Sequence, residues 1–131
     1  MADLRKCAVI GVGFVGATAA FTLADSGLFS EIVLLDANRK KAEGEAADIS
    51  HGIAFSQPCV VRAGDYVDLA GCGLIIIAAG ANQKPGETRI ELLGRNKAIL
   101  KSIIEQITPV NRDAILLVVS NPVDILTFRG I

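Results

Sequence analysis

Short, continuous apolar runs recur along the 131-residue chain, separated by longer segments in which polar and apolar residues mix. The runs lie at Cys7–Ile10, Ile32–Leu35, Val60–Ala63, Leu74–Ala78 and Ile115–Val119, and the run at Val60 is the weakest. None of them alternates polar with apolar residues, as a strand with one face in solvent would. Continuous apolar runs of this length are typical of parallel strands that are buried on both faces.

The longer segments are predicted to form three helices: Phe14–Asp25, Arg39–Ser50 and Arg89–Ile107. Gly27 and Gly52 lie just beyond the first two and favour their ends, while Asn38 is a suitable N-cap for the second.

The third predicted helix has the clearest start signal. Thr88 and Glu91 have the spacing of a capping box, in which each side chain bonds the other residue's backbone amide. The apolar positions expected to face the core are Ile90, Leu93, Leu100, Ile103, Ile104 and Ile107.

Strands and helices that alternate in this way predict an α/β fold with a doubly wound parallel sheet, which is Rossmann-like. The expected strand order is 3-2-1-4-5-6, and residues 1–131 suffice for a single domain of this kind. In such sheets the ligand crevice lies at the carboxyl ends of the strands.

The first run ends in a glycine-rich turn that fits the pattern G-x-G-x-x-G, formed by Gly11, Gly13 and Gly16. Such a turn lets the backbone approach a pyrophosphate, which would bind the free amides at the start of the next helix. Glycines at a strand-to-helix turn can also serve geometry alone.

Asp36 ends the second run, where a carboxylate can accept hydrogen bonds from an adenosine ribose and repel a 2′-phosphate. The alternative is that Asp36 only caps a turn. Strand, glycines and acid together predict dinucleotide binding, with NAD favoured as the cofactor. The cations Arg39, Lys40 and Lys41 nearby keep NADP open.

The loop after the fourth run contains Lys84-Pro85-Gly86-Glu87, a type II turn signature, and could act as a lid over the crevice. Arg89 follows in the first helical turn, where the helix dipole disfavours a cation. A ligand would explain that placement. The alternatives are a solvated surface arginine or an ion pair with Glu87 or Glu91.

Taken together, these segments resemble the N-terminal half of the NAD-dependent L-lactate dehydrogenases. The similarity spans residues 6–127 and is carried by four motifs: GVGFVG, LLDANRKKAEGEAADISHG, AGANQKPGETR and SNPVDILT. The loop motif is far more specific than the glycines.

The resemblance implies a set of cofactor-binding residues: Gly11, Gly13, Val15, Gly16, Asp36, Lys41, Tyr66, Gly80, Ala81, Ser102, Val119 and Asn121. The substrate-binding residues it implies are Gln83, Arg89, Asn121 and Asp124. Arg89 would also be catalytic, because a guanidinium stabilises the negative charge that grows on the ketone oxygen during hydride transfer.

The resemblance implies pyruvate and lactate as the substrate pair. Gln83 is neutral and suits a methyl group, whereas a malate-type enzyme would be expected to carry an arginine there to pair a second carboxylate. A malate-type fragment therefore stays open as an alternative. Asn121 could instead form an Asx turn before Pro122, a proline that in the family follows a cis bond.

The family's catalytic histidine, its aspartate partner and a second substrate-binding arginine come from the half that follows these motifs. The one histidine here, His51, matches no catalytic position. We therefore expect residues 1–131 to form the dinucleotide-binding domain without the catalytic domain, and to bind NAD(H) without turnover. An inert fragment is the remaining alternative. The run at Ile115–Val119 would form an apolar sheet edge and favour self-association.

Composition excludes several other classes of protein. Thirteen basic and fourteen acidic residues are interspersed, which gives no basic stripe for nucleic acid. The apolar runs are too short to span a membrane, and no export signal precedes them. Three widely spaced cysteines indicate buried, reduced thiols in a cytoplasmic protein, with no metal site.

Overall fold

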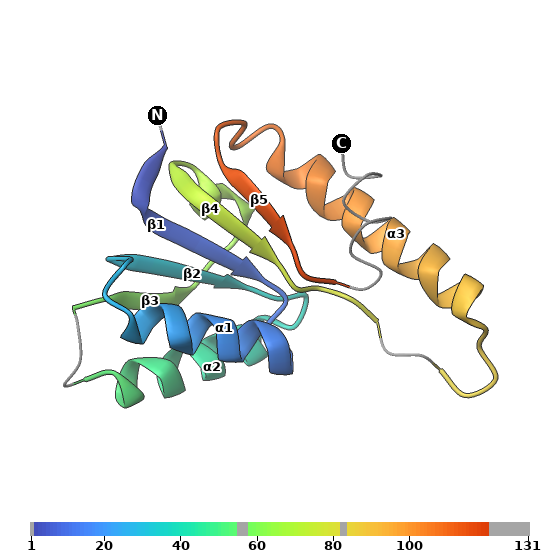
Figure 1. Ribbon diagram of the computed structural model, residues 1–131, viewed down its shortest axis with the longest axis horizontal. Helices are drawn as coiled ribbons and strands as arrows, with labels where there is room; N and C mark the ends of the chain where they lie inside the picture. The colour runs from blue at the N-terminus through green and yellow to red at the C-terminus, as the bar shows by residue number, and fades with distance from the viewer. Residues whose placement is uncertain (1, 55–57, 82–83, 121–131) are drawn as a thin grey trace.

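Five parallel strands form one open sheet in the order β3-β2-β1-β4-β5, with helices on both faces (Figure 1). The computed structural model describes residues 2–54, 58–81 and 84–120. The strands are β1 (Asp3–Ile10), β2 (Glu31–Leu35), β3 (Val60–Ala63), β4 (Cys72–Ile77) and β5 (Ile115–Val118). The helices are α1 (Phe14–Asp25), α2 (Arg39–Gly52), α3 (Arg89–Ile107) and the short 3-10 helix η1 (Tyr66–Leu69). The predicted α/β doubly wound sheet is confirmed.

The predicted elements match closely, and the differences have local causes. Strand β1 begins at Asp3 rather than Cys7, because the Asp3 amide donates to the Gly71 carbonyl at 2.6 Å and extends the pairing with β4. Helix α2 continues two residues beyond Ser50 to Gly52. The short helix η1 was not predicted, since four residues are too few for a periodic signal.

Alternate strand residues face two separate cores. One core lies under α1 and α2, where small residues at Ala20, Ala24, Ala42 and Ala46 are buried against Val9 and Leu34, among others. The other lies under α3 and joins Ile10, Leu35, Ile75 and Ile77 to Leu100, Ile103 and Ile107. Both faces of the central strands are therefore covered, which explains their continuous apolarity.

Helix α3 packs on the sheet mainly through its C-terminal part. Its buried residues begin at Asn96, and the residues before them extend past the carboxyl ends of the strands (Figure 1). The expectation that Ile90 faces the core was wrong, since its side chain is 82% exposed. The other five expected core positions are buried or partly buried. Periodicity identified the correct face but could not tell how far the helix projects.

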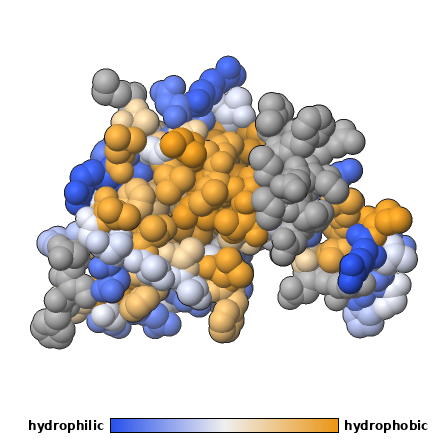
Figure 2. All heavy atoms as spheres, in the orientation of Figure 1, coloured by the Kyte–Doolittle hydropathy of each residue, from blue (hydrophilic) through white to orange (hydrophobic). Residues whose placement is uncertain are grey.

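Strand β5 leaves apolar side chains exposed at the edge of the sheet. Ile115 is 66% and Leu117 is 47% exposed. Their register partners on β4 are Leu74 and Ile76. Figure 2 shows apolar side chains gathered over the middle strands on the face turned to the viewer.

Two of the three thiols are buried, as expected. Burial raises the pKa of Cys7 to about 12 and that of Cys72 to about 11, so both stay protonated at neutral pH. Cys59 is only partly buried, in contrast to the expectation.

No helix in the described part of the chain has the length and apolar character needed to cross a bilayer.

Two glycine-to-alanine substitutions should have opposite effects on the free energy of unfolding. A Cβ at Gly16 would collide with the Gly11 carbonyl oxygen and lie 3.4 Å from Ala78 Cβ, so we expect Gly16→Ala to destabilise by about 3 kcal/mol. A Cβ at Gly44, on the exposed side of α2, would meet nothing within 4 Å. Gly44→Ala should therefore stabilise by about 0.8 kcal/mol. Urea unfolding followed by circular dichroism measures both, and equal effects would contradict the packing described.

Candidate functional site

The three glycines of the turn after β1 have different structural roles. Gly11 has a φ of +94°, and a Cβ there would lie 2.5 Å from the Ala79 backbone nitrogen. Gly16 is buried against the Gly11 carbonyl. Gly13 faces open space, with nothing within 4 Å of an added Cβ. The first and third glycines let the turn pack tightly, and the second leaves room for a ligand to approach the backbone.

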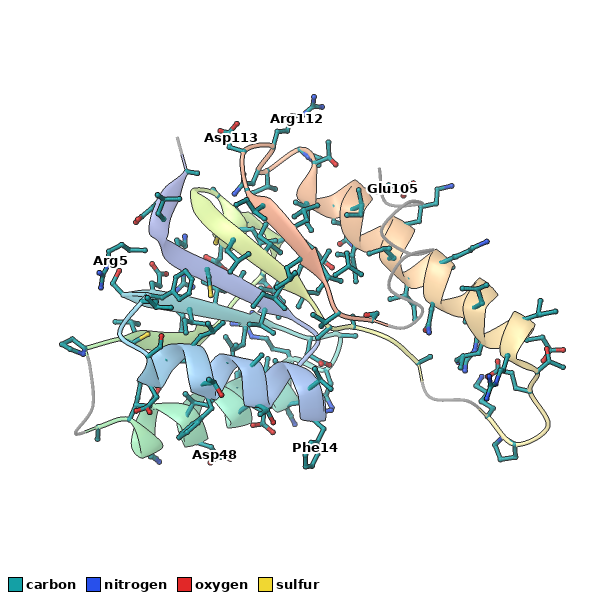
Figure 3. The ribbon with its side chains drawn as sticks, in the orientation of Figure 1. Arg5, Phe14, Asp48, Glu105, Arg112 and Asp113 are labelled. Atoms are coloured by element: carbon teal, nitrogen blue, oxygen red, sulfur yellow. The ribbon has the colours of Figure 1, made fainter. Side chains whose placement is uncertain are left out.

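Helix α1 begins at this turn without a side-chain cap. Its N-cap is Gly13, and within residues 2–54 no side chain caps the helix and no acid lies in its first turn. The first amides of a helix have no intrahelical acceptor, and they carry the positive end of the helix dipole. Phe14, the first helical residue, points away from the sheet (Figure 3). The start of α1 therefore offers free backbone donors to an anion.

The Asp36 carboxylate joins the end of β2 to the glycine turn. Its Oδ2 accepts a hydrogen bond from the Val12 amide at 3.0 Å, and its Oδ1 accepts one from the Asn38 amide at 2.9 Å. Asn38 in turn caps α2 by accepting from the Lys41 amide, as predicted. Asp36 thus caps a local turn, as the alternative had it, and also fixes the loop that carries Gly13.

A crevice of about 1240 Å³ opens at the carboxyl ends of the strands, between the glycine turn and α3. That volume exceeds the roughly 300–1,000 Å³ of pockets for drug-sized ligands, so an extended ligand fits better. The sequence-predicted residues that line it are Gly11, Gly13, Val15, Asp36, Lys41, Tyr66, Gly80, Ala81 and Ser102.

Two predicted cofactor residues in the described part of the chain are not in this lining. Gly16 lies beneath the turn, and Val119 packs against the core under α1 and α2. Asn121 lies outside the described residues, as do Gln83 and Asp124. Among the lining residues, burial raises the pKa of the Tyr66 hydroxyl, so it stays protonated at neutral pH.

Sequence reasoning missed Asn96, a buried polar residue in the lining. Its Oδ1 accepts a hydrogen bond from the Ala81 amide at 2.9 Å, which fixes the start of the loop after β4. Asn96 lies between Leu93 and Leu100 on the apolar face of α3. A polar residue at a core position was the signal that could have found it.

The acid Glu87 joins the loop before α3 to the helix itself. Glu87 accepts two hydrogen bonds from the Arg95 guanidinium, at 2.7 and 2.8 Å, and the contact lowers the pKa of Glu87. The type II turn is confirmed by Gly86 at φ +80° and by the bond from the Glu87 amide to the Lys84 carbonyl. Glu91 completes the predicted capping box with Thr88.

Arg89 is exposed in the first turn of α3 and does not line the crevice. The two acids considered as its alternative partners bind other groups, Arg95 and the Thr88 amide. The structure therefore brings nine of the cofactor candidates together around the crevice but leaves Arg89 apart from them.

The one histidine of the sequence lies far from the crevice. His51 is exposed in the last turn of α2, a helix of 14 residues that starts beside the crevice. At 1.5 Å per residue, the 12 positions from Arg39 to His51 separate this histidine from the start of α2 by about 18 Å. Within residues 2–54, 58–81 and 84–120, no cluster of three or more His, Cys, Asp or Glu could hold a metal ion.

Comparisons with known proteins identify the family of this chain. The family model for the lactate/malate dehydrogenase NAD binding domain matches residues 5–129. L-lactate dehydrogenase 1 of Clostridium acetobutylicum is 58% identical over 123 residues, which cover 94% of this chain and 39% of that protein. The chain thus spans about two fifths of the length of the curated relatives it matches.

Solved structures of lactate and malate dehydrogenases are also similar to this chain. A lactate dehydrogenase from a Medee basin deep-sea metagenome superposes with a TM-score of 0.93 at 46% identity, covering 99% of this chain and 41% of that one. A malate dehydrogenase from Archaeoglobus fulgidus, solved in complex with NADH, gives 0.88 at 37% identity, covering 95% and 43%. The chain belongs to the lactate/malate dehydrogenase family and corresponds to the NAD-binding domain of that family.

Proposed function

We propose that residues 1–131 form the NAD-binding domain of an L-lactate dehydrogenase and hold NAD(H) in the crevice at the carboxyl ends of the strands. The observation that carries this proposal is the Asp36 carboxylate, fixed in the crevice by the amide of the glycine turn. Each carboxylate oxygen has two lone pairs and accepts one backbone bond here, so capacity remains for two ribose hydroxyls.

The other cofactor residues are proposed to bind successive parts of the same ligand. The free amides at the start of α1 would bind the pyrophosphate, where the missing side chain of Gly13 leaves the approach open. Val15 and Lys41 would contact the adenosine side, and Gly80, Ala81 and Ser102 the path beyond it. NAD, when bound, supplies the carbon that gives or accepts the hydride.

For the reaction of the whole protein we propose hydride transfer between lactate and pyruvate. Arg89 would polarise the ketone, and Gln83, Asn121 and Asp124 would bind the substrate. Because Arg89 lies outside the crevice, the loop and the first turn of α3 would have to move inward. The Glu87–Arg95 pair would carry the loop and the helix together. The 58% identity to an L-lactate dehydrogenase favours this substrate over malate.

The chain should bind NADH, and one carboxylate should contribute much of the affinity. Asp36→Asn keeps an acceptor for the Val12 amide but loses the charge, so we expect about tenfold weaker NADH binding. The control is Asp48→Asn, on the outer side of α2 (Figure 3), which should bind like the unmodified chain. NADH fluorescence titration gives the dissociation constants. No binding by the unmodified chain would favour the inert alternative.

Bound NADH should not be consumed by this chain in the presence of pyruvate. General acid catalysis contributes roughly 10²- to 10⁴-fold, and His51 lies at the far end of α2 from the crevice. The absorbance of NADH should stay flat, while a full-length L-lactate dehydrogenase consumes it in the same buffer. Loss of NADH at enzymatic rates would show that another proton donor serves the site.

We also propose that the exposed strand β5 mediates self-association, as sheet edges with apolar, uncharged side chains do. Leu117→Lys places a charge on this edge and should shift sedimentation at tens of micromolar toward the monomer. Val67→Lys, at an exposed apolar position in η1, is the matched control and should change nothing. A compact monomer for the unmodified chain would contradict the proposal.

A further inference from the structure

The guanidinium of Arg39 is held by two carboxylates beside the crevice. Its Nε donates to Glu43 Oε1 at 3.2 Å, and its Nη1 donates to Asp65 Oδ1 at 2.9 Å. These hydrogen bonds, first that to Glu43 and then that to Asp65, raise the pKa of Arg39. Arg39 is the first residue of α2 and follows Asp36 by only three positions.

The two carboxylates reach Arg39 from different elements. Glu43 lies one turn further along α2, while Asp65 comes from the loop that follows β3. Because β2 and β3 are parallel neighbours, Asp36 and Asp65 follow strands that end at the same edge of the sheet. Both line the crevice.

An arginine near the acid that binds the adenosine ribose is the residue that sites for NADP use to bind the 2′-phosphate. Here such an arginine is present, but two of its donors are directed to carboxylates. Asp65 also adds a second negative charge to the lining. Both features oppose a 2′-phosphate, independently of Asp36.

We propose that Asp65 and Glu43 are specificity-determining residues, which hold Arg39 away from the adenosine ribose and so help to exclude NADP. The proposal rests on the proposed function of NAD binding. Asp36 repels the 2′-phosphate, and Asp65 and Glu43 withhold the Arg39 guanidinium, which could compensate for that repulsion. Removing the Asp36 charge alone leaves the ion pairs of Arg39 in place, and removing those ion pairs alone leaves the Asp36 charge in place.

The expected effects are modest, because the side chains of Arg39, Glu43 and Asp65 are 48%, 57% and 75% exposed. Exposed ion pairs are weak and screened by salt. With Asp36 intact, Asp65→Ser and Glu43→Ala together should improve NADPH binding about twofold at most. Serine keeps a small polar side chain before η1, and alanine favours the helix.

The decisive variant combines these two substitutions with Asp36→Asn. It should bind NADPH about tenfold more tightly than Asp36→Asn alone, because a freed guanidinium can form charge-assisted hydrogen bonds to the phosphate. This gain should shrink as salt rises. Adding Arg39→Ala should abolish this gain in NADPH affinity.

A charge-matched control replaces Asp25 and Asp48 with asparagine in the Asp36→Asn chain. Both residues are exposed and absent from the crevice lining.

Titrations of NADPH and NADH fluorescence on the same samples distinguish the outcomes. A gain that survives Arg39→Ala, or that the charge-matched control reproduces, would overturn the proposal, since lost negative charge alone would explain it. Unchanged NADPH affinity with intact NADH binding would also overturn it. The ion pairs of Arg39 with Glu43 and Asp65 would then serve only to hold α2 against the loop after β3. Failure of the unmodified chain to bind NADH would overturn the proposed function itself.

Discussion

The contact between the glycine turn and the chain leaving β4 is the constraint on which the site depends. Gly11 lies so close to Ala79 that no Cβ fits between them, and Gly16 packs on the Gly11 carbonyl. These contacts bring three segments together, namely the end of β1, the start of α1 and the loop after β4. The segments can approach this closely because Gly11 and Gly16 carry no side chain.

The Asp36 carboxylate extends this junction to β2. Asp36 accepts a hydrogen bond from the Val12 amide. It thereby connects the turn to β2, which pairs with β1, and to α2, which begins at Arg39. Beyond it, the Arg39–Asp65 contact continues the connection to the loop after β3. Groups that line the crevice and follow three neighbouring strands are thus connected along one edge of the sheet.

Much of the fold and part of the site could be predicted from the sequence, because those signals are local. Asn38, Thr88 and the glycine turn determine where helices begin through contacts within a few residues. The pairing of Arg39 with Asp65 spans 26 positions and depends on strand adjacency, so no local pattern reveals it. The exposure of Ile90 depends on how far α3 projects. Likewise, the sequence could nominate Arg89 but could not place it relative to the crevice.

The alanines at positions 20, 24, 42 and 46 have a consequence for the precision of the site. A larger core side chain can change rotamer and let a helix slide by a fraction of an ångström, but alanine has no χ angle with which to relax. Helix α1, whose buried residues are Gly16, Ala20 and Ala24, therefore packs on the sheet through contacts that have few alternative arrangements. The amide donors at the start of α1 are aimed before any ligand arrives, so little ordering entropy is left for binding to overcome.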